Sequence, residues 1–600
     1  MRNQVQKMKM FSMLLVAIML FGTVAFGATF TAVATGNWSA TATWGGTVPS
    51  LINTGDQITI PAGINVTMDN DVTLNGSLSS ITVLGTLSST ASNALTVTQG
   101  TLAGTLTTAT INVDSVVFGA AATMTFVGNF TANTVNSWAT ALVSTATMTV
   151  SNVLTLSGGN LAIFTAGTLA LGNNAIINVA GGTLALTGTG ALNLTLGYNV
   201  NYMTASATTG AELNGAFLNN VNVSVGAGNM VSLGSSIVVM DTLTLASGNL
   251  NLNGHNLTVS GQISNIGSGM LYSDSTSSLT INTQSSVLGA LNFVANWNTV
   301  RNFTVNIANN GNVRVHTNMN VADSLHLLAG KVYLVADTLQ MGVLGTITGA
   351  SATSYVVTSL NAVLARHMIA GAVDSTLFPI GTMAMYYPAT LLLHATSTSG
   401  ILMASVDSTV YSQGTIGMGT EISVNQPVVN ATWYFETDIT SGLNLSMSLM
   451  WASASEINAF DRSMSYISHY TSSAWNYYAH GPAMLVGGLW STTRDSIMSL
   501  SPFAVFDPAT VTTNVPEIAA IANEVELYPN PSSDNVIIKS GTITDDATYF
   551  NVLDIAGQVL ITDRLTNDYY TVSLKELSAG IYFIRIFNDK TNVVKRITKI

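Results

Sequence analysis

Short alternating stretches fill the region from Asp56 to Gly342 and limit what this chain can fold into. Apolar and polar residues alternate in stretches such as "ITVLGTLSS" and "TLALTGTGALNLTLG", and Gly, Asn and Ser separate one stretch from the next. A period of two is typical of β-strands, and no sustained 3.6-residue period predicts a long amphipathic helix. The sequence therefore predicts many short strands and an all-β fold.

A longer repeat runs through the same region. The segments "VLTLSGGNLAI" from Val153, "TLTLASGNLNLNGHNLTV" from Thr242 and "SLHLLAGKVYLVADTLQM" from Ser324 can be superposed. Their spacing of about 85 residues is too long for one supersecondary unit and predicts several turns of a solenoid. A parallel β-helix suits these strands because each one buries its apolar face only when turns stack about 4.8 Å apart. A series of antiparallel sandwiches is the structural alternative.

The open end of a solenoid needs a cap because an exposed sheet edge invites aggregation. The segment "TGNWSATATWGGTVPS" is predicted to supply it, with Trp38 and Trp44 over the first turn. The patterns W-x(5)-W-G-G-x-V-P, G-D-x-I-x-I-P-x-G and V-T-M-D lie between Gly36 and Asp71. Together they resemble the start of many secreted bacterial β-helix proteins and, more loosely, the G8-type extracellular module.

The composition indicates an all-β protein that is stable by burial and backbone pairing alone. The 600 residues include no cysteine, so no disulfide contributes outside the cell. Only 8% of residues are charged, against a usual value of about 25%, yet 47% are hydrophobic, which argues against disorder. The net charge of -12 disfavours nucleic acid as a partner.

The first residues predict a secretory signal peptide at 1–27. Three basic residues precede an apolar run from Met10 to Phe21, and a small-residue stretch ends at Gly27. This run is shorter than the roughly 20 residues that a membrane span needs, which disfavours an uncleaved anchor. We expect cleavage before Ala28 and no transmembrane span in the mature chain.

Aromatic residues gather after the repeats, in segments such as "TWYFETDITSGLNLSMSLMW" and "AWNYYAHGPAMLVGGLW". Longer strands with widely spaced aromatic residues predict a β-sandwich-like domain at 351–510, after a capped β-solenoid at 28–350. Core packing is the favoured role of these aromatic residues, and sugar stacking is the alternative.

The basic residues are distributed very unevenly along the chain. Six of the 17 lysines and arginines lie between Ala28 and Val515, and eight follow Pro516. This abrupt change predicts a linker at 511–523 and a further domain at 524–600. Strands such as "NVIIKS" and "GIYFIRIFN" make this domain a small Ig-like β-sandwich.

The terminal segment resembles the type A C-terminal sorting domain of the type IX secretion system. The matching residues are Tyr528, Pro529, Asn530 and Pro531, then Asp554 and Gly557 of D-x-x-G, then Leu577, Gly580 and Tyr582 of L-x-x-G-x-Y, and finally Lys595, Arg596 and Lys599. An ordinary Ig-like module would explain the strands but not this motif set. The resemblance implies recognition by the outer-membrane type IX machinery. It also implies that the domain is often removed afterwards, with the passenger released or attached to the cell surface.

No catalytic residue, cofactor or metal site is predicted. The HExxH, CxxC, GxSxG, P-loop and EF-hand patterns do not occur, and the seven histidines are scattered. Parallel β-helices do include polysaccharide lyases and glycoside hydrolases, which need paired carboxylates or a base beside a basic residue. Asp69 and Asp71 form a close acidic pair, but no Arg or Lys lies near them in the sequence.

Two surface features are hypotheses. Asp followed by Ser or Thr and then by an apolar residue or Thr resembles the O-glycosylation acceptor of the same bacterial phylum, although chance explains it equally well. The acceptors would be Ser115, Thr242, Ser275, Ser324, Thr338, Ser375, Ser408 and Ser496. A threonine-rich outer face could bind ice or polysaccharide, but its T-x-T pairs do not recur at a fixed place in the repeat.

We therefore expect a secreted or cell-surface protein with a structural or adhesive role and no catalytic activity. Its expected partners are the type IX machinery and a polysaccharide or a host or cell surface. A carbohydrate-active β-helix enzyme is the alternative. A carboxylate cluster beside Arg or Lys in an open groove would favour the enzyme, whereas a groove lined by Thr, Asn and Ser would favour adhesion.

Overall fold

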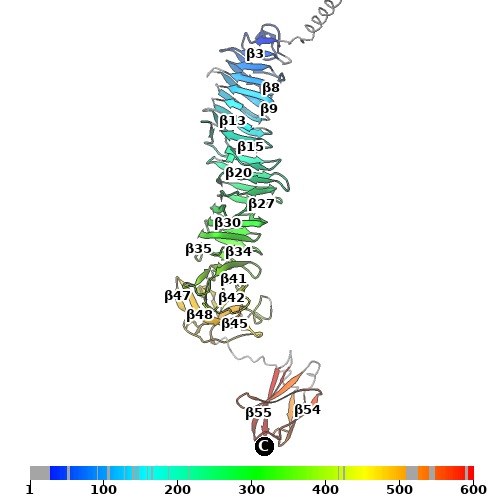
Figure 1. Cartoon of the computed structure of the whole chain (residues 1–600), viewed down its shortest axis with the longest axis vertical. Coiled ribbons are helices and arrows are strands. Elements are labelled where there is room, and N and C mark those ends of the chain that lie inside the picture. Colours follow the sequence, from blue (N-terminus) through cyan, green and yellow to red (C-terminus); the bar gives the residue numbers. More distant parts are fainter. Residues whose placement is uncertain are drawn as a thin grey trace, which may run out of the picture. The chain divides into compact units, whose positions relative to one another are not determined.

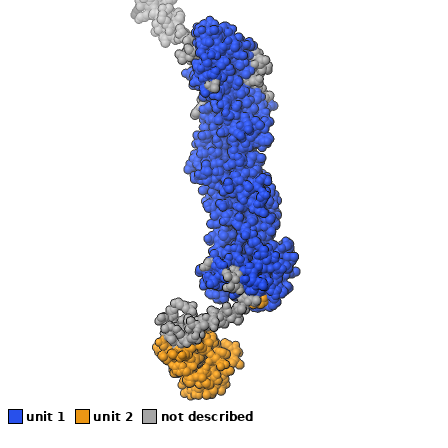
Figure 2. All heavy atoms as spheres, turned by 180° about the vertical axis from the view of Figure 1, so that it is seen from behind, with its two compact units in different colours: residues 1–507 blue, residues 508–600 orange. Residues whose placement is uncertain are grey.

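The computed structural model describes residues 27–49, 55–508, 525–539, 548–587 and 592–600, with short gaps at 77, 91, 105–108, 127–128, 138–141, 145–146, 159, 164–166, 187, 214, 417 and 423–425. The signal peptide predicted at 1–27 lies outside these residues except for Gly27, and the predicted linker at 511–523 lies outside them entirely. The chain divides into two compact units, residues 1–507 and 508–600 (Figure 2).

The first unit contains a parallel β-solenoid of about 13 turns over residues 57–381, and Figure 1 shows its strands stacked from β3 to β35. The chain is all-β, as the sequence predicted. The first strands are β1 (Thr29–Thr31), β2 (Gly36–Asn37), β3 (Gln57–Ile60), β4 (Asn65–Met68), β5 (Val72–Leu74), β6 (Ser80–Val83), β7 (Thr86–Ser89), β8 (Ala94–Gly104), β9 (Thr110–Phe126), β10 (Asn129–Ser137), β11 (Leu142–Ser144), β12 (Thr147–Leu156), β13 (Asn160–Ile163), β14 (Thr168–Leu171), β15 (Ala175–Val179), β16 (Thr183–Leu186), β17 (Ala191–Asn193), β18 (Tyr198–Tyr202), β19 (Ala207–Thr208) and β20 (Leu218–Ser224). The later strands are β21 (Met230–Ser232), β22 (Ile237–Val239), β23 (Thr242–Ser247), β24 (Asn249–Asn251), β25 (Asn256–Val259), β26 (Gln262–Ser264), β27 (Met270–Ser273), β28 (Ser278–Thr283), β29 (Ala290–Leu291), β30 (Phe293–Ile307), β31 (Asn312–Val315), β32 (Met319–Ala329), β33 (Lys331–Leu334), β34 (Thr338–Met341), β35 (Thr346–Thr348), β36 (Val356–Val357), β37 (Val363–Met368) and β39 (Ile380–Gly381).

Alternation along each strand separates the core from the surface. In β23, Leu243 and Leu245 are fully buried, while the threonines beside them face outward. The parallel register places Val221 and Ile263 on either side of Leu243, so apolar side chains stack on apolar side chains from turn to turn. One continuous core follows from this register because each turn buries the inner face of the next.

The register also explains the long repeat. Leu154, Ile177, Val200, Val221 and Leu243 are successive ladder partners, and four steps take the chain from the first repeat to the second. The block of about 85 residues therefore corresponds to four turns of the solenoid, each of about 22 residues.

Asparagine side chains on neighbouring turns form hydrogen bonds with one another along the outer surface. Asn201 Nδ2 donates to Asn178 Oδ1 at 3.0 Å, and Asn220 Nδ2 donates to Asn199 Oδ1 at 2.7 Å. The Asn220 Oδ1 atom in turn accepts from the backbone N–H of Thr242 at 3.1 Å, where the next strand begins. Asparagine suits these positions because one amide donates to one turn and accepts from another.

The N-terminal segment forms the first turn, since β1 pairs in parallel with β3 and β2 with β4. A 3-10 helix, η1 (Thr41–Trp44), follows it. Trp38 and Trp44 are buried, and their ring centroids lie 4.9 Å apart in an edge-to-face contact. Their indole N–H groups donate to the carbonyls of Pro49 and Trp38 at 3.0 and 2.8 Å. The likeness of this segment to the G8-type module stays a prediction.

Parallel pairing continues past the boundary at 350 that the sequence suggested. β36 pairs with β33 and β39 with β36, which carries the ladder to Gly381. β37 pairs in parallel with β34 and antiparallel with β41 (Gly400–Asp407), so the solenoid passes directly into the next sheet. The half-buried Arg366 of β37 joins both parts by donating to the carbonyls of Gly345 and Leu377. The composition changes before the topology does, because the apolar strands β36 and β37 still pair in parallel with the solenoid, and β37 also pairs antiparallel with β41.

Two antiparallel sheets complete the first unit. Besides β41, they comprise β38 (Thr376–Phe378), β40 (Ala389–Leu393), β42 (Val428–Thr437), β43 (Leu445–Trp451), β44 (Glu456–Ile457), β45 (Tyr466–Thr471), β46 (Ala474–Trp475), β47 (Met484–Val486), β48 (Leu489–Ile497) and β49 (Phe503–Phe506). Phe378 of one sheet meets Phe435 of the other with ring centroids 6.5 Å apart. Trp433 and Trp451 are fully buried in the same cluster, which confirms core packing for these aromatic residues.

A buried histidine in this region predicts a pH dependence. The His469 ring is 5% exposed and stacks on Phe503 at 4.2 Å. Burial and the nearby positive charge of Arg494 lower the pKa of His469 from 6.5 to about 4. Between these values the unfolded chain binds a proton that the folded chain rejects, so stability falls as pH falls from about 6.5 to about 4.

We expect His469→Phe to remove this loss, which amounts to roughly 2 to 3 kcal/mol. Thermal unfolding of both proteins at pH 7.5 and pH 4.5 measures it. The exposed His316 offers a matched control, His316→Phe, which keeps the wild-type difference between the two pH values. An equal acid sensitivity in wild type and His469→Phe would contradict the assignment.

Candidate functional site

The second unit is a small β-domain made of two antiparallel sheets. One contains β50 (Glu526–Tyr528), β51 (Asn535–Lys539) and β54 (Tyr569–Ser573), and the other contains β53 (Val559–Arg564), β52 (Tyr549–Leu553), β55 (Gly580–Phe587) and β56 (Asn592–Lys599) (Figure 1). Alternate residues of these strands form one buried cluster, which includes Val536, Phe550 and Ile584. The domain therefore has a hydrophobic core of its own.

The Y-P-N-P motif is joined to the end of the chain by the Asn530 side chain. Its Nδ2 donates to the Arg596 carbonyl at 2.9 Å, and its Oδ1 accepts from the Thr598 N–H at 3.0 Å. These two bonds imitate the pairing of a neighbouring strand, which explains why an amide side chain stands there. Tyr528 ends β50 and leads the chain into this contact.

The basic end is divided between a structural lysine and two accessible residues. Lys599 is 9% exposed, and its Nζ donates to the Ser533 carbonyl. Backbone bonds of 2.9 Å from Ser532 N–H to the Thr598 carbonyl and from Ile600 N–H to the Ser532 carbonyl hold the same junction. Lys595 is partly exposed and Arg596 is exposed on β56. The sequence pointed to these cations but not to their separate environments.

The remaining motif residues set two turns. Asp554 Oδ1 accepts from the N–H groups of Ala556 and Gln558 at 2.9 Å, and Gly557 adopts a φ of 84°, a conformation that glycine takes without strain. In L-x-x-G-x-Y, Leu577 packs against the core and Gly580 opens β55. The Tyr582 hydroxyl donates to the Ser578 carbonyl at 2.8 Å.

These features define a β-sandwich whose signature residues tie its turns and its last strand together. Residues 526–599 match the family described as secretion system C-terminal sorting domain. The chain thus carries the sorting domain of the type IX secretion system, which supports export by that route to the cell surface or the medium. A search of curated proteins found no match to the chain.

The outer face of the four-stranded sheet carries apolar residues as well as charge. Ile581 of β55 is 45% exposed and Val594 of β56 is 52% exposed. Arg585 lies over the Phe587 ring, with its Cζ 4.9 Å from the ring centre. The sequence analysis considered the motif residues of this domain and did not identify this face. The alternation in "GIYFIRIF" would have revealed it, because the outward positions are apolar where polar residues are usual.

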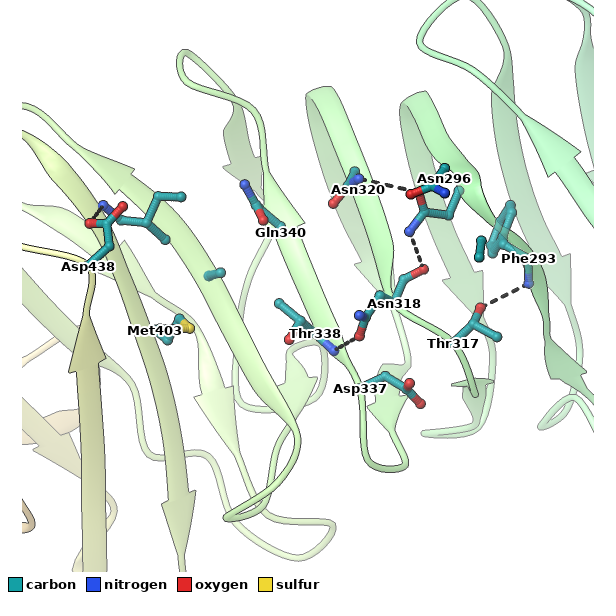
Figure 3. Close-up of a pocket in the computed structure, with 14 residues that line it drawn as sticks. Phe293, Asn296, Thr317, Asn318, Asn320, Asp337, Thr338, Gln340, Met403 and Asp438 are labelled. Atoms are coloured by element: carbon teal, nitrogen blue, oxygen red, sulfur yellow. Dashed lines mark hydrogen bonds between the residues drawn. The ribbon is translucent and has the colours of Figure 1, made fainter.

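The first unit contains a groove of about 620 Å³ along the late turns of the solenoid (Figure 3). It crosses β30, β32, β34, β37 and β41, with Asp438 just beyond β42. The floor of the groove is continuous across four strands. Its residues Asn320, Gln340, Ala365 and Met403 are successive ladder partners. Ala365 is 1% exposed and its short side chain leaves the hollow between the longer Gln340 and Met403.

Amides and hydroxyls line most of this groove. Figure 3 shows Gln340, Asn320 and Asn296 along one side and Thr338, Asn318 and Thr317 along the other. Several of these groups fix one another: Asn298 Nδ2 donates to the Asn318 carbonyl at 2.8 Å, and Asn318 Oδ1 accepts from the Thr338 N–H at 2.9 Å. The lining therefore presents both donors and acceptors on a fixed frame.

A stacked pair of aromatic side chains, one of them exposed, lies beside the groove in the sequence. The rings of Tyr272 and Trp297 stack with centroids 4.4 Å apart and planes 18° apart, and Trp297 is 43% exposed. The pairing of β27 with β30 shifts register between Leu271 and Ser273, and Asn296 has a φ of 67°. Trp297 is the sequence neighbour of Asn296 and Asn298, which both line the groove, whereas Trp297 itself is not one of the lining residues.

The eight residues with the glycosylation pattern all lie at accessible positions. Ser275, Ser375, Ser408 and Ser496 are exposed, and Ser115, Thr242, Ser324 and Thr338 are partly exposed. Thr338 lines the groove, and the Ser324 hydroxyl donates to Asn302 Oδ1 at 2.5 Å. Accessibility is compatible with modification, which stays a prediction for all eight.

The acidic pair near the first turn supports backbone structure. Asp69 Oδ1 accepts from the Ser39 N–H at 3.0 Å, and the bond to the Ser39 hydroxyl lowers the pKa of Asp69. Asp71 Oδ1 accepts from the Ala94 N–H of the next turn at 2.9 Å. Within the part of the chain that is described, no three His, Asp or Glu residues form a group that could hold a metal. None of the described helices has the length and apolar character that crossing a membrane requires.

Proposed function

We propose that this protein is an exported structural or adhesive component of the cell surface that binds its target without catalysis. The observation that supports this proposal is the solenoid groove, whose described lining residues include seven amides or hydroxyls in or just before three successive strands and no lysine or arginine. Such a lining holds a polar ligand by hydrogen bonds but has no cation to stabilise a developing negative charge. The sorting domain provides the signal for export from the cell.

A polysaccharide-cleaving enzyme is the second candidate, and one observation favours it. Asp337 and Asp438 both line the groove, and glycoside hydrolases use two carboxylates. Asp438 Oδ1 already accepts a hydrogen bond from the Ile401 N–H at 2.7 Å, so this carboxylate helps to hold the backbone of β41. The adhesive proposal therefore has the stronger support.

The proposal is tested in the native host with and without this protein. We expect cells that lack it to lose attachment to polysaccharide-coated surfaces and to recover attachment when the full chain is restored. The purified exported protein should release no reducing ends from the same polysaccharides over a day. Release that disappears in Asp337→Asn together with Asp438→Asn would overturn the proposal in favour of the enzyme.

A further inference from the structure

We propose that the groove across β30 to β41 binds a neutral polysaccharide chain that lies along the solenoid axis, with Trp297 as the aromatic contact at one end. This inference deepens the proposed function and rests on it. Four steps between neighbouring strands, at about 4.8 Å each, give the groove a length of about 19 Å. That length suits several sugar units of an extended chain better than a compact small molecule.

The hydrogen-bonding groups of the lining suit sugar hydroxyls. A hydroxyl both donates and accepts, and so does each amide side chain. Gln340 and Asn296 make no side-chain hydrogen bond to any described residue, so their amides are available for a ligand. The neighbouring Asn298, Asn318 and Asn320 are held by bonds between turns, which fixes the frame before binding and lowers the entropic cost.

The aromatic pair adds a surface for the apolar face of a sugar ring. Large aromatic side chains supply contact area at low conformational cost. Trp297 is 43% exposed although its ring is held in place by Tyr272. An exposed tryptophan that is stacked on a neighbouring ring can offer its free face to a sugar, and this is the role that we assign to Trp297.

Charge and backbone pairing exclude other extended ligands. Asp337 and Asp438 are the charged residues among the described lining, so an acidic polysaccharide would be repelled. A peptide that added itself as a strand would need an unpaired sheet edge. β32 and β34 are already paired on both sides, to β30 and β37 respectively and to each other, so the groove floor offers no edge.

Affinity electrophoresis of the mature exported protein tests this inference, with laminarin, xylan and polygalacturonate as immobilised probes. We expect retardation by at least one of the two neutral polysaccharides and none by polygalacturonate. Trp297→Ala should weaken binding about tenfold, which is about 1.4 kcal/mol. Ala365→Leu should weaken it at least as much by filling the hollow. Tyr477→Ala removes a similarly exposed aromatic residue outside the groove and should bind as wild type does.

Two outcomes would overturn the inference: no retardation of the wild type by either neutral probe, or wild-type affinity in Trp297→Ala. Trp297 is at the surface, so this variant keeps the test valid even when Ala365→Leu does not fold. These results are separate from those for the proposed function. If cells with Trp297→Ala attach as well as wild-type cells, the groove is not the site of attachment, but the adhesive role remains. If the protein releases reducing ends, the adhesive role itself is contradicted.

Discussion

Deletion of residues 524–600 removes the protein from the cell surface and the medium, and the truncated chain accumulates in the periplasm. The physical reason is that the deleted segment contains every strand of the sorting domain, while the core of residues 1–507 remains complete without it. The truncated chain therefore folds but lacks the part that the type IX machinery recognises. Mass spectrometry of surface, medium and periplasmic fractions from the native host measures the result.

A point variant makes the same test without shortening the chain. Asn530→Ala loses the two bonds that join the Y-P-N-P turn to β56, which destabilises the domain by roughly 1 to 3 kcal/mol. We expect a reduced extracellular amount, with the remainder in the periplasm. Asn567→Ala, at an exposed position of the same domain, is the control and should be exported normally. Export of the 524–600 deletion at wild-type level would show that the domain is not the export signal.

Gly261→Ala unfolds part of the solenoid, and this is the second large effect that we expect. A Cβ atom at Gly261 would lie 1.8 Å from the carbonyl oxygen of Asp241 in the preceding turn. The same carbonyl accepts from the Gln262 N–H at 2.5 Å, so the two turns cannot separate without breaking the ladder. Because the obstacle is backbone, we expect a loss of about 3 kcal/mol or more.

Hydrogen exchange of the mature protein locates this effect, since each turn depends on its neighbours. Protection should fall first in β22 to β27 around the altered corner. Gly481→Ala is the matched control, because a Cβ there has no atom within 4 Å and the glycine does not adopt a positive φ. The control should stay within about 0.5 kcal/mol of the wild type. Equal losses in both variants would mean that close approach between turns is not the cause.

The sequence predicted those parts of the structure that depend on local alternation. Leu243 and Leu245 point inward because residues two apart share a face, and this can be read directly from "TLTLAS". The sorting motifs were likewise visible because each is short and continuous. The contact of Asn530 with Arg596 and Thr598 was not visible, because it joins residues more than sixty positions apart.

The groove could not be predicted for the same reason. Its floor combines Asn320, Gln340, Ala365 and Met403, which meet only through the register of four different strands. Its depth depends on one alanine among longer side chains, and no sequence motif marks such a difference in side-chain length. The end of the solenoid was placed at 350 from composition, whereas the parallel ladders continue to Ala365 and Gly381.

The stacking of turns also determines how the solenoid responds to force. The hydrogen bonds between turns lie along the axis, so tension applied to the two ends of the stack opens one ladder at a time instead of shearing many strands together. Each turn that peels away releases about 22 residues, or about 75 Å of extended chain. The solenoid would therefore lengthen in small steps under tension, one turn at a time, because each turn contacts only its neighbours.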